Sequence, residues 1–211
     1  KYKNMIEKVN KAFQILSLEG IPLGKVDIPF KYILSGINKY ESFRIGAGLQ
    51  TNSLFSKWFS VGGFAGYGLR DKAFKYGGNI QFNIQQRTNT VLRFDYSRDI
   101  TEPGNVDYFV RNGSVFSNQS LRNFQRSRFD SVEQFKINFS TKIRPSIQTD
   151  IWLMNETRNP AKYEYEFVNN GSNIRSFKNT ELGIGFRLTK GESFTRMGRA
   201  KLRTKPATTE L

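Results

Sequence analysis

Histidine and cysteine are both absent from the 211 residues of this chain. Without cysteine the chain has no disulfide framework and no thiolate metal site. Without histidine it lacks the usual general base and the commonest metal ligand. The lipase, acyltransferase and protease mechanisms that place a histidine beside a serine or a carboxylate are therefore closed to it. We expect no catalytic residue, no cofactor and no metal site.

The chain also lacks a run of apolar residues long enough to cross a bilayer as a helix. It opens on a lysine without a basic-then-apolar leader, so we expect any signal peptide to lie outside this segment. A mean hydropathy of −0.54 does not exclude a membrane β-barrel, because half of the residues of each barrel strand face water. A barrel is thus the membrane architecture that the composition leaves open.

Acidic residues are scarce beside basic ones. The chain has 33 Lys and Arg against 18 Asp and Glu, which gives a formal net charge of +15. Such an excess favours anionic surroundings: nucleic acid, phospholipid head groups, lipopolysaccharide or an acidic partner protein. The charge does not select among them.

The pattern that is present is alternation with a period of two, which is typical of strands with one apolar and one polar face. It is clearest in three successive segments, 43–50, 58–70 and 73–85, although glycines blur the middle one. In the third segment Phe74, Tyr76, Ile80, Phe82 and Ile84 alternate with polar residues and glycine. The same alternation recurs over 25–34, 90–100, 132–143, 147–154, 162–167 and 180–188.

About nine strand signals with no strong helix between them predict an all-β antiparallel meander. Residues 1–24 are expected to form an amphipathic N-terminal helix over Lys1–Glu19 and a linker, and 25–189 the strands, interrupted by a long loop at 101–131. Residues 190–211 are a basic tail or the start of a further strand. Because no closing strands are recognised, the chain resembles a fragment of a larger architecture.

Three features favour a barrel wall over a soluble sheet. One face mixes charges of both signs with amides and glycines, as a water-filled lumen does, and aromatic residues recur near strand ends. Short turns at 87–90, 144–146 and 169–172 alternate with longer connections at 35–41, 101–131 and 155–161, although the 51–57 turn is longer than ideal. The candidate lumen-facing polar residues are Arg44, Lys75, Arg93, Asp95, Lys136, Asp150, Glu181 and Arg187.

The alternative is a soluble basic β-sheet protein that binds a polyanion such as RNA, with aromatic residues as stacking platforms. Stacking platforms need aromatic residues beside Lys and Arg on one small face, whereas here they recur on the non-basic face of almost every strand. In the long loop, Arg122, Arg126 and Arg128 are candidate anion contacts, for example to lipid sugars or a partner, with a solvated loop as the simpler interpretation.

Two stretches carry a resemblance to a known family. Residues 38–52 match N-x-x-E-x-x-R-x-G-x-G-x-x-T-N, and residues 62–76 match G-G-x-x-x-Y-G-x-x-D-K-x-x-K-Y, apart from Ser42, where the family usually has glycine. This pattern resembles a Bacteroidota outer-membrane family of unknown function. Its members usually follow a carboxypeptidase-regulatory-like domain, and their barrels are similar to surface-antigen barrels of the outer-membrane assembly superfamily.

The resemblance is clear over about residues 20–77 and implies a location in the outer membrane, but no reaction. From the sequence we therefore expect a non-enzymatic outer-membrane β-barrel protein of envelope biogenesis, transport or surface attachment. Its expected surroundings are outer-membrane lipid, with lipopolysaccharide and an envelope protein as candidate partners and no nucleic acid.

Overall fold

The computed structural model spans the chain and describes residues 20–34, 38–103, 128–161, 167–169, 172–174, 176–191, 193–197, 200–205 and 209–210. The helix expected over Lys1–Glu19 lies outside these residues, as does most of the loop expected at 101–131. Within the described residues, no helix combines the length and the hydropathy that a membrane crossing requires.

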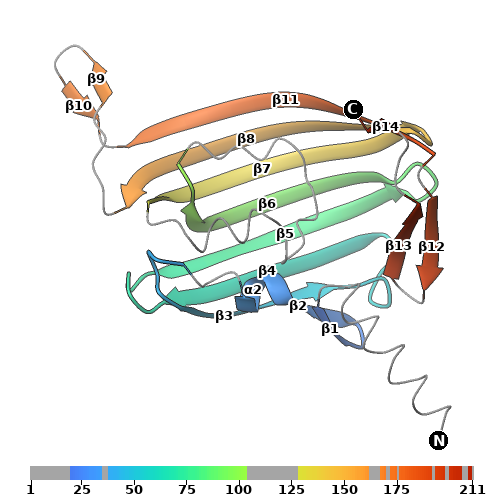
Figure 1. Cartoon of the computed structure of the whole chain (residues 1–211), viewed down its shortest axis with the longest axis horizontal. Helices are drawn as coiled ribbons and strands as arrows, with labels where there is room; N and C mark the ends of the chain where they lie inside the picture. The colour runs from blue at the N-terminus through green and yellow to red at the C-terminus, as the bar shows by residue number, and fades with distance from the viewer. Residues whose placement is uncertain are drawn as a thin grey trace, which may run out of the picture.

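The described strands form one large antiparallel sheet in which sequence neighbours pair with each other, as Figure 1 shows. Nine strands make up the meander: β1 (Gly20–Leu23), β2 (Val26–Pro29), β3 (Arg44–Thr51), β4 (Phe59–Gly68), β5 (Phe74–Gln85), β6 (Thr90–Thr101), β7 (Phe129–Arg144), β8 (Ile147–Ala161) and β11 (Phe177–Lys190). A short helix, α2 (Phe30–Leu34), follows β2. The all-β meander expected from the alternation is therefore confirmed.

Five short strands lie outside this meander. β9 (Phe167–Asn169) pairs with β10 (Ser172–Ile174), β12 (Ser193–Met197) pairs with β13 (Ala200–Lys205), and β14 (Thr209–Glu210) pairs with the last two residues of β11. Among the described strands, β1 and β11 do not pair with each other. The sheet is therefore open and is not closed into a barrel.

The structure corrects several expected boundaries. β1 lies within the expected linker, and the strand expected over 25–34 ends at Pro29, where α2 begins. The connection expected at 155–161 is the end of β8, which continues to Ala161. The 162–167 segment is not a strand of the sheet: residues 162–166 lie outside the described part of the chain, and Phe167 begins the β9–β10 hairpin. Within the expected basic tail, Ser193–Met197 and Ala200–Lys205 pair with each other as β12 and β13.

These corrections change the end of the sheet at which the 169–172 turn lies. We call the "turn end" of the sheet the end that holds the connections 52–58, 86–89 and 145–146, and the "loop end" the end that holds 38–43, 69–73 and 102–128. The β9–β10 hairpin joins β8 to β11 at the loop end. The expected placement of the 169–172 turn beside the short turns was therefore wrong.

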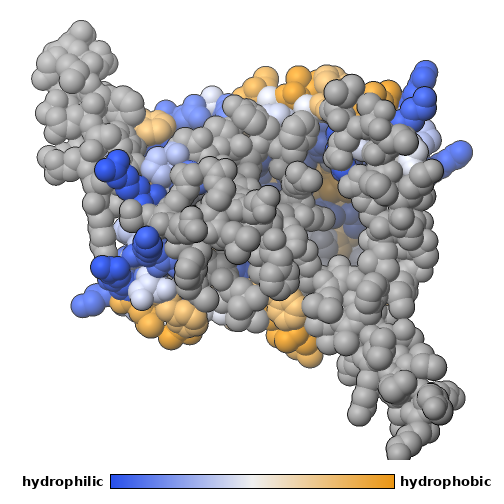
Figure 2. Space-filling view, viewed as in Figure 1, coloured by the Kyte–Doolittle hydropathy of each residue, from blue (hydrophilic) through white to orange (hydrophobic). Residues whose placement is uncertain are grey.

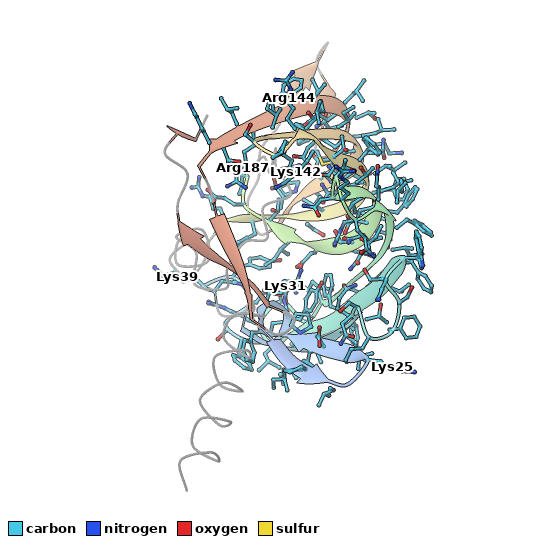
Figure 3. All side chains as sticks on the ribbon, turned by 90° about the vertical axis from the view of Figure 1, so that its right-hand side faces the viewer. Lys25, Lys31, Lys39, Lys142, Arg144 and Arg187 are labelled. Atoms are coloured by element: carbon cyan, nitrogen blue, oxygen red, sulfur yellow. The ribbon has the colours of Figure 1, made fainter. Side chains whose placement is uncertain are left out.

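The sheet is strongly curved, and Figure 3 views it nearly along its strands. Strand pairing aligns the polar positions of neighbouring strands on one face, for example Asn79 with Asp95 and Asp95 with Lys136. This polar face lies inside the curve, where the labelled Lys142 and Arg187 are seen in Figure 3. Helix α2 packs against it, with Tyr32 stacked on Phe64 at 4.8 Å between ring centroids.

The other face, which we call the apolar face, is covered by large hydrophobic side chains that are exposed or half-buried. Two complete rows cross six strands: Val61, Ile80, Phe94, Ile137, Leu153 and Leu182, and then Phe59, Phe82, Leu92, Phe139, Ile151 and Ile184. Phe74 is 71% exposed and Leu182 is 76% exposed. Figure 2 shows hydrophobic side chains near β11 and near β3 and β4, with hydrophilic ones towards the strand ends.

Candidate functional site

All eight candidate polar residues lie on the polar face. The strand pairs bring Arg93, Asp95 and Lys136 onto adjacent positions of β6 and β7, where Arg93 and Asp95 form an ion pair at 2.7 Å. Trp152 donates a hydrogen bond from Nε1 to Glu181 Oε1 at 2.8 Å. The remaining members are Arg44, Lys75, Asp150 and Arg187. That this face borders a water-filled lumen stays a prediction.

The three candidate anion contacts of the long loop are placed only in part. Arg128 directly precedes β7 and is exposed. Arg122 and Arg126 lie outside the described residues.

The loop end of the polar face holds a buried ion network, which we call the Glu41 cluster. Glu41 is completely buried, and its carboxylate accepts hydrogen bonds from Arg44 Nε at 3.0 Å and lies 2.7 Å from Lys75 Nζ. Arg44 also binds Asp99, with Nη2 2.5 Å from Oδ1, and Lys75 binds Asp71. Two cations thus share three carboxylates, which compensates charges that would be costly to bury alone.

The turn before β3 orients Glu41. Asn38 Oδ1 accepts a hydrogen bond from the backbone N–H of Glu41 at 2.7 Å, and Asn38 Nδ2 donates one to the Glu41 carboxylate at 2.8 Å. Burial by itself would raise the pKa of Glu41, but hydrogen bonds from Arg44, Lys75 and Asn38 outweigh it and hold the pKa below its ordinary value. Glu41 is therefore ionised at neutral pH, as the cluster requires.

The Glu41 cluster gives a physical meaning to the sequence pattern that suggested the outer-membrane family. Its spaced residues Asn38, Glu41 and Arg44, and then Asp71 and Lys75, meet in this one network. The glycines of the pattern make room for it, because a Cβ on Gly66 would lie 2.9 Å from Arg44 Cδ. Gly48 in turn leaves space for the ring of Tyr32.

A second ion group lies on β7 and β8 at the loop end. Arg158 binds Glu156 with Nε 2.7 Å from Oε1 and lies 3.9 Å from Asp130. All three residues are buried. The loop end of the polar face is therefore occupied by paired charges.

The turn end of the polar face is hollow. A cavity of about 220 Å³ lies over β6, β7 and β8, and a larger one of about 850 Å³ lies over the turns that follow β3 and β5. The two share Gln81, Asn89 and Val91 as lining residues. Among the remaining lining residues, amides and hydroxyl groups predominate.

Several acidic residues of the polar face lie in ion pairs. The described residues contain no group of three acidic side chains placed to hold a metal ion. Asp95 and Asp99 lie on the same face of β6, and the carboxylate of each pairs with an arginine.

Sequence reasoning missed Glu41, Asp71 and Asn138. For Glu41 and Asp71 the signal was available, because both belong to the pattern of the resemblance. Asn138 is one polar position among many on β7, and only its burial, at 3% exposed, distinguishes it.

Comparison with known proteins identifies no relative: no family model, no curated protein and no solved structure matches the chain.

Proposed function

We propose that this chain forms part of the wall of an outer-membrane β-barrel, with the polar face towards a water-filled lumen and the apolar face towards acyl chains. The observation that carries the proposal is the inverted distribution of polarity. Among the residues that the structure describes, twelve polar or charged side chains are buried, against four hydrophobic ones, while many large apolar residues of the sheet are exposed. A water-soluble domain buries such residues, and an exposed apolar surface of this extent indicates a membrane or a partner.

The position of the apolar residues supports a membrane in particular. Their runs on the apolar face cover 43–49 on β3, 74–84 on β5 and 182–188 on β11. The strand pairs allow the middle of each run to be expressed as a position on β5. The middle of the β3 run corresponds to residue 75 of β5, and the middle of the β11 run corresponds to residue 83 of β5. The apolar band thus crosses the strands diagonally, by about 1.3 residues per strand.

This diagonal has the slope that a barrel requires. With a rise of about 3.3 Å per residue and a strand spacing of about 4.8 Å, the drift corresponds to strands inclined by about 40° to the normal of the band. Strands of membrane barrels are tilted by about 35–45°.

Strand length and sequence resemblance agree with this interpretation. β5 and β6 have 12 residues each and β11 has 14, whereas a tilted membrane strand needs about 9–11. The resemblance in residues 38–52 and 62–76 implies the same location. Because the nine-strand sheet is open, the proposal requires further strands to complete the barrel.

The proposed role is non-enzymatic and belongs to envelope biogenesis, transport or surface attachment. Outer-membrane lipid would surround the apolar face, and lipopolysaccharide or an envelope protein would contact the loop end. The alternative of RNA binding gains little support, because the exposed aromatic rings of Phe74, Phe82 and Phe186 lie on the face that lacks the paired basic residues.

Fractionation of cells that express the chain tests the proposal. We expect the protein in the envelope pellet, extracted only by detergent, with faster migration on gels before boiling than after it. Recovery of the folded protein in buffer without detergent would contradict the proposal.

A matched pair of variants makes this test specific to the apolar face. Ile80→Lys places a charge at the centre of the apolar band and should remove the fast-migrating form, since a lysine at the bilayer midplane costs about 2–4 kcal/mol. Ser60→Lys places the same charge beside the larger cavity on the polar face and should retain that form. Equal behaviour of the two variants would contradict the assignment of the faces.

A further inference from the structure

The cavities at the turn end differ in chemistry from the rest of this basic chain. The smaller one is lined by Gln81, Asn89, Val91, Arg93, Asn138, Ser140, Lys142, Gln148 and Asp150. Its charges largely balance, because Arg93 is paired with Asp95 and Lys142 is accompanied by Asp150. The larger cavity adds mainly hydroxyl and amide groups, from Thr51, Asn52, Ser53, Ser56, Ser60, Asn83, Gln85, Gln86 and Thr90.

Two buried groups in the smaller cavity lack strong hydrogen-bond partners: one is a donor, on Asn138, and the other is an acceptor, on Asp150. Asn138 is 3% exposed, and its Nδ2 has no hydrogen-bond partner. Asp150 is also 3% exposed, and its carboxylate accepts from Gln148 Nε2 at 3.2 Å. Within the part of the chain that the structure describes, no ion pair joins Asp150 to a cation. A buried amide without a partner is costly, so a ligand that accepts from Asn138 and donates to Asp150 would stabilise both.

We propose that this hollow binds an uncharged carbohydrate. A sugar hydroxyl is both a donor and an acceptor, so neighbouring hydroxyl groups can accept from Asn138 and donate to Asp150 at the same time. An anion would be repelled by Asp150, and a cation by Lys142 and Arg93. The small cavity suits one sugar ring, and its continuation into the larger one allows a short oligosaccharide.

The binding site goes beyond the proposed place in a barrel wall and does not depend on it. Most residues that line the smaller cavity, Asn138 and Asp150 among them, lie on three adjacent strands, β6, β7 and β8, whose pairing fixes their spacing. Binding can be measured in detergent or in buffer, whichever keeps the chain folded. Failure of carbohydrate binding would therefore leave the membrane proposal untouched, and the reverse also holds.

A tryptophan provides the measurement. Trp152 lies directly beside Asn138 on the polar face, and the chain has one other tryptophan, Trp58, which is exposed outside the hollow. In a Trp58→Phe background, fluorescence therefore reports on the neighbourhood of Asn138. The probes are the methyl glycosides of glucose, galactose and mannose, N-acetylglucosamine and the corresponding trisaccharides. Succinate and phosphate serve as anionic comparators and methylammonium as the cationic one.

We expect at least one of the saccharides to give a saturable change in Trp152 fluorescence below about 10 mM, and the charged comparators to give none. Asn138→Leu and the isosteric Asp150→Asn should each weaken binding about tenfold, through the loss of one hydrogen-bond partner. Asn155→Leu makes the same substitution on the apolar face, where Asn155 binds Thr180, and should change affinity less than about twofold.

Unchanged circular dichroism in each variant shows that a loss of binding is not a loss of fold. Three results would overturn the proposal: no saccharide produces a saturable response, a charged comparator binds as well as the best sugar, or folded Asn138→Leu and Asp150→Asn bind as tightly as the parent.

Discussion

Arg44 on β3 binds Asp99 on β6 with two hydrogen bonds, from Nη1 at 3.1 Å and from Nη2 at 2.5 Å. Both β4 and β5 lie between these two strands, and Gly66 on β4 leaves no side chain in the way of Arg44. A contact between strands that are not neighbours ties together the polar face of a curved sheet. Because Arg44 also donates a hydrogen bond to Glu41, the contact links β6 to the Glu41 cluster.

Substitution of Gly66 by alanine should destabilise the fold by about 1–3 kcal/mol, because the new Cβ would lie 2.9 Å from Arg44 Cδ while Glu41 and Asp99 hold the guanidinium of that side chain in place. Gly78→Ala is the matched control on the apolar face, since its nearest neighbour, the Gly62 carbonyl oxygen, is 3.4 Å away. That variant should be neutral or slightly stabilising. Urea unfolding in detergent measures both, and equal destabilisation would refute the steric argument.

Glu41→Gln should cost about 3 kcal/mol of folding free energy, because Arg44 and Lys75 each lose a buried carboxylate and keep only one. The control is Asp95→Asn, which breaks a partly exposed pair with Arg93 and should cost less than about 1 kcal/mol. The same unfolding measurement compares them. A smaller loss in Glu41→Gln than in Asp95→Asn would show that the Glu41 cluster does not hold the loop end together.

The lowered pKa of Glu41 predicts how this contribution depends on pH. Because the carboxylate binds a proton less readily in the folded chain than in the unfolded one, its contribution is fully present above the ordinary value of 4.5 and is lost as the pH falls through the lowered pKa. The stability difference between the parent and Glu41→Gln should therefore be constant from about pH 7 to about pH 5 and shrink only in stronger acid. A difference that already shrinks near neutrality would contradict the assignment.

The alternation of residues predicted most of the sheet because it is a local property. In segments such as 73–85 every second side chain must face the same way, so the two faces of a strand can be assigned without knowledge of its neighbours. The register then follows from short turns, and it places all eight candidate polar residues on one face. Whether lipid covers the other face is not a local property, and the sequence cannot decide it alone.

The predicted boundaries were wrong where the alternation of a segment does not reveal which strand it pairs with. Residues 162–167 alternate as a barrel strand would, yet Phe167 belongs to a small hairpin, because period two does not distinguish a strand of the main sheet from a two-stranded ribbon. The sequence predicts a loop over residues 155–161, but pairing with β7 extends β8 to Ala161. The Glu41 cluster could not be assembled from the sequence, since Asp99 lies 55 residues from Arg44.

The diagonal apolar band makes a prediction that separates a membrane from any other cover of the apolar face. Phe59 on β4 and Ile184 on β11 belong to the same row of paired residues, which crosses the sheet at right angles to the strands. If the strands stood upright in a bilayer, these two residues would lie at equal depth. With a tilt of about 40°, the five strand spacings between them separate their depths by about 15 Å, with Ile184 near the middle of the bilayer and Phe59 near its surface.

Phe59→Trp and Ile184→Trp, each made in the Trp58→Phe background, can be compared in lipids brominated at different positions along the acyl chain. Trp152, buried on the polar face, contributes the same background to both. Deep bromines should quench the tryptophan at position 184 most strongly, and shallow bromines the one at position 59. Identical depth profiles at the two positions would contradict the tilt of the strands. Absence of quenching at both positions would contradict the contact between the apolar face and lipid.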